Sequence, residues 1–257
     1  MSQFINIIRK EYEINARRIA IWIMAALVIL FYVATEIAPF FDGSAIIIVP
    51  DQIWPAAALT VFKLNLFFPL VGGILAADRL SRDYRLGVDE LRESTPVKQA
   101  SFLLAKYLGV VAVWLVPEVL CLMFIGIIPI VGGLVGWTYL PAILVSGLAM
   151  NLPALLFVTA FSLACPMVMP VRVYQVLFTG YWFWGNFLSP EVFPTISGTL
   201  LNAAGIFALQ GFFSGTVGPG ITFTAVQAVL NILILLAMSA GILMVLTLYL
   251  SNKMKKA

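Results

Sequence analysis

Long apolar runs alternate with short polar segments along the 257-residue chain. A helix crosses roughly 30 Å of hydrocarbon with about 20 residues, because each residue rises 1.5 Å along the axis. These runs lack the regular apolar–polar alternation of barrel strands and therefore predict spanning helices. Six spans are expected, over residues 19–38, 56–77, 107–130, 140–165, 173–188 and 221–250. The predicted fold class is an all-α polytopic membrane protein, with residues 1–257 forming one membrane domain.

Two further segments complete this predicted layout. Residues 1–18 place Phe4, Ile8 and Tyr12 on one helical face with charges elsewhere, which is typical of a helix lying at the membrane interface. Residues 189–220 are apolar but interrupted by nine prolines and glycines. Irregular backbone is tolerated at membrane depth only where protein buries it, so we expect an external re-entrant segment between spans five and six. The alternative is an ordinary external loop lying on the membrane surface.

Composition and charge narrow the class and orient the chain. Charged residues make up 11% of the sequence, against roughly 25% in soluble proteins, which excludes an ordinary soluble domain. All of the 15 basic residues except Lys63 lie in the N-terminal segment, in loops two and four with their flanks, or in the C-terminal tail. Because basic residues in short loops stay in the cytoplasm, both termini are expected there. We expect a bacterial plasma membrane.

Residues 78–98, between the second and third spans, carry five basic and five acidic side chains. Leu80, Tyr84, Val88 and Leu91 recur at the spacing of one helical stripe. A segment that is neutral overall is poorly suited to nucleic acid or anionic lipid, which attract a basic excess. Mixed charge beside a small apolar stripe favours a protein partner. The alternative is a solvated loop whose charges only keep it in the cytoplasm.

Residues 72–109, GGILAADRLSRDYRLGVDELRESTPVKQASFLLAKYLG, resemble the segment after the second span in permeases of type-2 ATP-binding-cassette (ABC) exporters. The family more often has Glu at the position of Asp83 and Thr at the position of Val88. The residues that match the family pattern in order are Asp78, Arg82, Asp83, Gly87, Leu91, Thr95, Pro96 and Lys106.

The resemblance implies a division of labour between subunits. Residues 1–18 would form an elbow helix, residues 78–98 a cytoplasmic coupling helix, and residues 189–220 an external gate. A separate ABC ATPase subunit would bind ATP and magnesium, and a second permease subunit would complete the translocation pathway. The residues implied to contact the ATPase are Leu80, Arg82, Asp83, Tyr84, Gly87, Val88, Leu91, Thr95 and Pro96.

The sequence offers little for chemistry within this chain. It contains no GxxxxGK[ST] motif for ATP phosphates and no histidine, which argues against a phosphate-binding loop and a histidine base. Cys121 and Cys165 both fall inside predicted spans without metal-ligand spacing. We therefore expect no enzymatic activity, no cofactor, no metal and no nucleic-acid partner for this chain.

Glu118 lies near the middle of the third predicted span, next to Pro117. An ionisable residue at that depth is a functional candidate, here for the translocation path. Asn151 of the fourth span is a second candidate, either as the partner of Glu118 or as a hydrogen bond between helices. A structural role within the bundle is the alternative. If Glu118 and Lys63 were coupling charges, the chain would be an ion- or proton-coupled secondary transporter or channel without an ATPase. A third class is an insertase or sensor scaffold whose charged segment recruits another protein.

Overall fold

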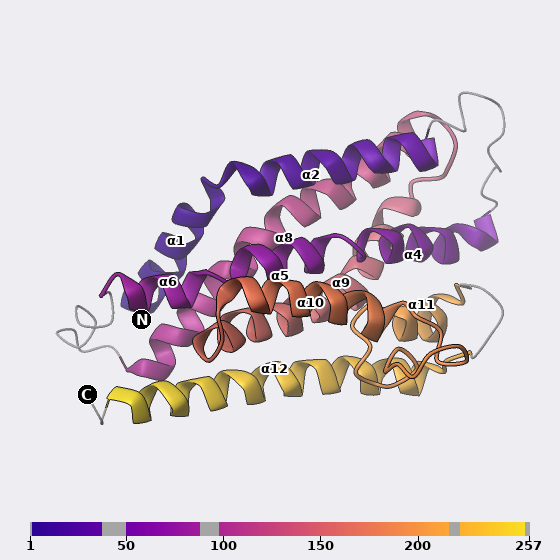
Figure 1. Cartoon of the computed structure of the whole chain (residues 1–257). Helices are drawn as coiled ribbons and strands as arrows, with labels where there is room; N and C mark the ends of the chain where they lie inside the picture. The colour runs from indigo at the N-terminus through magenta and orange to yellow at the C-terminus, as the bar shows by residue number, and fades with distance from the viewer. Residues whose placement is uncertain (1, 38–49, 88–97, 216–221, 255–257) are drawn as a thin grey trace.

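The computed structural model describes residues 2–37, 50–87, 98–215 and 222–254 (Figure 1). Within these ranges the chain forms helices and connecting turns and contains no strand, which confirms the predicted all-α class. The helices are α1 Ser2–Ala16, α2 Ile19–Tyr32, η1 Val33–Ile37, η2 Pro50–Gln52, α4 Ile53–Leu64, α5 Phe68–Ala76, α6 Arg79–Arg85, α8 Gln99–Val131, α9 Tyr139–Ala164, η3 Cys165–Met167, α10 Val171–Asn186, α11 Ile206–Phe213 and α12 Ala225–Met254.

Four helical stretches are long and apolar enough to cross a membrane: Ile53–Arg85, Gln99–Val131, Tyr139–Met167 and Ala225–Asn252. A fifth is added if α1 and α2, which meet at a bend of 67°, are counted as one span. Helix α10 covers most of the predicted fifth span but has 16 residues, about 24 Å of helix. Several apolar helices thus indicate a membrane location, and the six-span layout stays a prediction.

The long helices run side by side along one direction, with α9 packed against α4, α5, α8 and α12 (Figure 1). Helix α9 is apolar around its whole circumference, which suits a helix surrounded by others. Both chain termini lie at the same end of the bundle as α6, and we call this the terminal end. Helix α11 and the first residues of α4 and α12 lie at the opposite, distal end.

The predicted second span is interrupted between Leu64 and Phe68, where residues 65–67 form a turn between α4 and α5. Pro69 follows at the start of α5 and has no N–H for the helical ladder. Side chains stabilise this break: Trp182 Nε1 donates to the Leu66 carbonyl at 3.1 Å, and the side-chain amide Nδ2 of Asn65 donates to the Ala204 carbonyl at 2.7 Å. The break therefore leaves a bonded turn inside the bundle.

Four buried asparagines hold the irregular backbone that precedes α11, and we call them the asparagine cluster: Asn65, Asn186, Asn202 and Asn231. Asn202 Nδ2 donates to the carbonyls of Ser197 and Asn186 at 2.7 and 3.1 Å. Asn231 Nδ2 donates to the carbonyl of Asn202 at 2.8 Å, and Asn186 Oδ1 accepts from the Ala203 N–H at 2.7 Å.

The predicted re-entrant segment, residues 189–220, is described up to residue 215. It consists of turns followed by α11, which begins after Gly205 in a left-handed conformation at φ 89°. Helix α11 packs against α4, α9 and α12, and the asparagine cluster bonds the backbone before it. Residues 202–205 are buried and meet the requirement that irregular backbone at membrane depth be covered by protein, whereas residues 189–194 are exposed. Its depth in a membrane stays a prediction.

Candidate functional site

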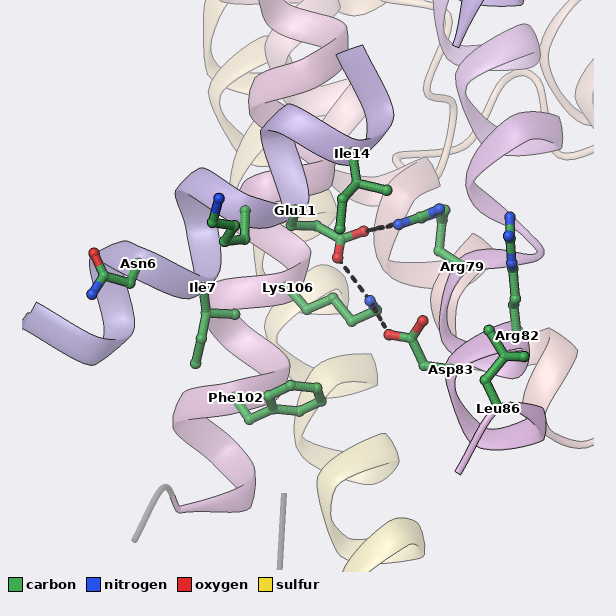
Figure 2. A pocket seen from close by; sticks show the side chains of 11 residues that line it. Asn6, Ile7, Glu11, Ile14, Arg79, Arg82, Asp83, Leu86, Phe102 and Lys106 are labelled. Atoms are coloured by element: carbon green, nitrogen blue, oxygen red, sulfur yellow. Dashed lines mark hydrogen bonds and ion pairs between the residues drawn. The ribbon is translucent and has the colours of Figure 1, made fainter. Parts of the chain in front are cut away.

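A buried cluster of charged side chains joins α1, α6 and α8 at the terminal end (Figure 2). We call it the ion cluster; it consists of Glu11, Arg79, Asp83 and Lys106. The Glu11 carboxylate accepts from Arg79 Nη2 at 2.7 Å and from Lys106 Nζ at 2.9 Å. Lys106 also pairs with Asp83. The side chains of Glu11, Arg79 and Lys106 are 8%, 5% and 3% exposed, so this part of the cluster is shielded from water.

Local features of α1 and α8 position Glu11. Asn15, one turn further along α1, donates from Nδ2 to Glu11 Oε1 at 2.8 Å and to the Glu11 carbonyl at 2.7 Å. On the facing helix stands Gly109, where an added Cβ would lie 2.7 Å from Glu11 Cβ and 3.0 Å from the Ile8 carbonyl oxygen. A side chain at position 109 would therefore force α1 away from α8 and pull the carboxylate from its partners.

The neighbouring basic side chains favour the ionised form of Glu11. Burial alone would raise the pKa of Glu11, because a carboxylate loses its hydration in the interior. The charges of Lys106 and Arg79, with the hydrogen bonds they donate, outweigh burial and hold the pKa of Glu11 below its ordinary value. The cluster contains two acids and two bases. It is formally neutral, which is the condition under which buried ions are tolerated.

A second ion pair lies close by and involves Arg18, the residue just before α2. Arg18 Nη1 lies 3.3 Å from Asp78 Oδ1 and 3.2 Å from the Leu75 carbonyl oxygen. This pair fixes the bend between α1 and α2 to the turn between α5 and α6. Two sets of ion pairs thus connect the N-terminal segment to α6 and the turn before it, one through Glu11 and the other through Arg18.

The ion cluster forms one wall of an open cleft of about 470 Å³. Figure 2 shows its other walls, which combine the apolar side chains Ile7, Ile14, Leu86 and Phe102 with polar ones such as Arg82. Leu86, just after α6, is 66% exposed. Such a surface can bind an apolar anchor flanked by charges on another protein.

The structure distributes the sequence-predicted coupling residues over different environments. Arg82 and Asp83 line the cleft, and Tyr84 is half-buried against the core. Leu80 is 1% exposed and packs inside this chain, which corrects its expected place on a surface stripe: the apolar side chain is already covered. Gly87 adopts φ 69° just beyond α6. Four of the predicted residues lie outside the described residues: Val88, Leu91, Thr95 and Pro96.

Sequence reasoning missed Glu11 and Arg79 as members of the site. A signal was present, because Glu11 and Asn15 continue the stripe of Phe4 and Ile8 at helical spacing. Two polar residues on the apolar face of an amphipathic helix indicate partners within the protein. Arg79 carried no comparable signal, since it lies among the other charges of residues 78–98.

Glu118 and Asn151 form a separate polar site where α8 packs against α9, and both are buried. The Asn151 amide lies near the Glu118 carboxyl, without a hydrogen bond of ordinary geometry between them. In the described part of the chain, Glu118 Oε2 and both polar atoms of the Asn151 side chain have no hydrogen-bond partner. Buried polar atoms without partners are rare, which keeps both residues as candidates for a functional site.

Comparisons with protein families, with curated proteins and with solved structures give no match for this chain. Within the described ranges, no group of three or more Cys, Asp or Glu side chains is arranged to hold a metal ion. Proposals about function therefore depend on the ion cluster, the cleft beside it, the pair formed by Glu118 and Asn151, and the resemblance carried by residues 72–109.

Proposed function

We propose that this chain is the membrane permease subunit of an ATP-driven exporter of the type-2 ABC class. In this proposal six spans provide half of the translocation pathway, and a second permease subunit, identical or different, provides the rest. An ABC ATPase subunit binds at the terminal end, in the cytoplasm, and hydrolyses ATP. The ion cluster is the observation that carries the proposal.

The energetics of the ion cluster favour a mechanical role over a topological one. Exposed charges are sufficient to keep a loop in the cytoplasm, whereas burying an ion costs several kcal/mol that only well-placed partners offset. Here Arg79 and Asp83 of α6 are bonded, directly or through Lys106, to α1 and α8. A displacement of the exposed end of α6 is therefore carried to α8, the 33-residue helix on which Glu118 lies.

The cleft beside the ion cluster supplies a surface for the ATPase. Leu86 presents an exposed apolar side chain at the end of α6, with Arg82 one turn earlier. An apolar anchor of this kind contributes on the order of 1–3 kcal/mol to an interface when it is covered. Phosphoryl transfer in the ATPase would then move the exposed end of α6 and rock the two permease subunits between inward and outward states.

The first experiment is affinity purification of the full chain from its native membrane in a mild detergent, followed by identification of the proteins that accompany it. We expect an ABC ATPase whose hydrolysis rate rises in the complex. Leu86→Ala should weaken the affinity for the ATPase roughly 5- to 150-fold, since it removes an apolar anchor. Less ATPase should therefore be recovered with the variant. Leu27→Ala on α2, an equally exposed leucine away from the cleft, is the matched control.

Recovery of the chain without any ATPase would contradict the proposal. Undiminished recovery of the ATPase with Leu86→Ala would show instead that the end of α6 is not the coupling surface.

An ion- or proton-coupled secondary transporter or channel is the second candidate, and the buried Glu118 carboxyl, whose Oε2 has no hydrogen-bond partner among the described residues, favours it. The purified chain reconstituted alone in vesicles distinguishes the two. A secondary transporter moves protons or ions down an imposed gradient without ATP, and Glu118→Gln abolishes that flux. A permease subunit shows no such flux without its ATPase. The control is Gln99→Glu, a polar exchange at the first residue of the same helix.

A further inference from the structure

Two apolar hollows join along the outside of α9 to form one groove. One hollow, of about 470 Å³, lies between α9 and α12, and the other, of about 370 Å³, lies between α9, α10 and the turns before α11. They share Phe161, Cys165 and Met238, so they are continuous, and we call them together the apolar groove. The Tyr174 hydroxyl in its wall is already bonded to Ser162 at 2.8 Å.

The dimensions of the apolar groove select a narrow occupant. Along α12 the first hollow runs from Ala237 to Tyr249, about 18 Å at the rise of a helix. This length is close to one leaflet of hydrocarbon, roughly 15 Å. Spread over that length, 470 Å³ describes a long and narrow hollow. A single acyl chain matches this length and shape.

The apolar groove meets a charged pocket at the terminal end. This pocket of about 630 Å³ lies between α6 and the first turn of α10, and Met169 lines both it and the groove. Arg85 and Arg172 line the pocket and are exposed, with Gln175 and Ser81 beside them. Arg172 forms no ion pair with any residue that the structure describes.

The acids near this pocket are neutralised by other elements. Asp78 also lines the pocket but pairs with Arg18 at 3.3 Å, and Asp83 pairs with Lys106. Residues 78–98 are neutral when counted along the sequence, yet this folding leaves Arg85 without a nearby free carboxylate among the described residues. Among the residues that the structure describes, the pocket is therefore basic.

We propose that an anionic glycerophospholipid from the leaflet at the terminal end binds here, with its phosphate at Arg85 and Arg172 and one acyl chain in the apolar groove. A basic pocket at the end of an apolar channel of one-leaflet length is complementary to that lipid in both charge and shape. The inference requires only that the chain lies in a membrane. It is independent of whether the chain couples to an ATPase.

The test uses the full chain in detergent, with phosphatidylglycerol and phosphatidylcholine of identical acyl chains as probes, and counts bound lipids by native mass spectrometry. We expect phosphatidylglycerol to bind roughly 5- to 30-fold more tightly, since each basic residue near a lipid phosphate attracts it and salt screens part of the effect. Arg85→Gln with Arg172→Gln should remove this preference. Arg9→Gln with Arg17→Gln removes the same charge from α1 and its end and should retain it.

A second pair of variants tests the apolar groove. Gly241 lines it, and an added Cβ there meets no atom within 4 Å, so Gly241→Leu fills the groove without a clash in the protein. Binding of both lipids should fall about tenfold or more. Gly180 on α10 is equally open but does not line the groove, so Gly180→Leu should leave lipid binding unchanged.

Three outcomes would overturn the inference. Equal affinity for the two lipids would show that Arg85 and Arg172 do not form a site for an anionic headgroup. Unaltered binding with Gly241→Leu would place the acyl chains elsewhere. A chain that forms a dimer in detergent and excludes both lipids, with Gly241→Leu weakening that dimer, would show that a second copy covers the groove.

Discussion

The ion cluster at the terminal end and the asparagine cluster at the distal end both bury polar side chains, yet they stabilise the protein by different means. In the ion cluster, Glu11, Arg79, Asp83 and Lys106 bond to one another across three helices. In the asparagine cluster, neutral amides such as that of Asn202 donate to backbone carbonyls of turns and loops. The first connects helices, and the second replaces missing helical bonds.

This difference determines where each kind of buried polar contact can stabilise the protein. A neutral amide loses little hydration energy when buried and satisfies irregular backbone one carbonyl at a time. A buried ion is tolerated only with its counter-ions, so removing one member leaves the others uncompensated. We therefore expect the ion cluster to fail as a unit, and the asparagine cluster to fail one bond at a time.

The largest effect is expected for Glu11→Gln. The change leaves Arg79 and Lys106 buried with Asp83 as their only acid in the ion cluster, and breaking a buried pair costs about 3–5 kcal/mol. Thermal unfolding in detergent, followed by loss of the monodisperse chromatographic peak, measures it. Glu191→Gln, the same charge change on an exposed distal residue, is the control. A midpoint equal to that of the wild type would refute a stabilising role for the ion cluster.

A smaller effect is expected for Asn202→Ala. It leaves the carbonyls of Asn186 and Ser197 without the Asn202 amide, and each unsatisfied buried group costs about 1–3 kcal/mol. Local relaxation should limit the loss to about 2 kcal/mol. Hydrogen–deuterium exchange should rise in residues 195–204 but not in α1. Faster exchange in α1 as well would mean that the two clusters are coupled, contrary to the comparison.

The two clusters should also differ in how their contribution to stability depends on pH. Because the pKa of Glu11 is lowered in the folded state, its stabilisation is complete above the ordinary value of 4.5 and is lost as the pH falls through the lowered value. The difference in unfolding midpoint between wild type and Glu11→Gln should therefore shrink below pH 4.5. The difference caused by Asn202→Ala should stay constant, since amides do not titrate. A constant difference for Glu11→Gln would show that its carboxylate is not the stabilising form.

The smallest effect is expected for Glu13→Gln. Glu13 bonds to Lys10 Nζ and Arg9 Nε, both at 2.8 Å, and these hydrogen bonds lower its pKa, but the pair is open to water. Exposed ion pairs are screened and ordered at an entropic cost, so the unfolding midpoint should not change at low or high salt. A loss comparable to that of Glu11→Gln would mean that burial does not distinguish the ion cluster from surface pairs.

The sequence predicts some of these features well because apolar length is a local property. The helices of the predicted third, fourth and sixth spans are present, as α8, α9 and α12; α8 begins at Gln99, well before the predicted start at residue 107, and the other ends differ by one to four residues. The break at residues 65–67 was not predicted, because Asn65 is held by carbonyls that lie 138 and 139 residues further along the chain. Local periodicity carries no information about partners so distant.

The candidate site was predictable only in part for the same reason. Asp83 and Lys106 were found through a resemblance in their own segment, whereas Glu11 joins them from α1. Leu80 was expected at the surface, because helical spacing identifies an apolar stripe but does not say whether this chain or another covers it. Burial of Arg79 could not be read from a charged neighbourhood in which most side chains were expected to be solvated.

The long sequence separations within the ion cluster also set an order of assembly. Glu11 is synthesised 68 residues before Arg79 and 95 before Lys106. At about 5–20 residues per second, its carboxylate waits roughly 5 to 20 s for Lys106. Gly109, the position that lets α1 approach α8, follows three residues later. Helix α1 therefore leaves the ribosome before α6 and α8, and it can reach its final position only after the first turns of α8 have been synthesised.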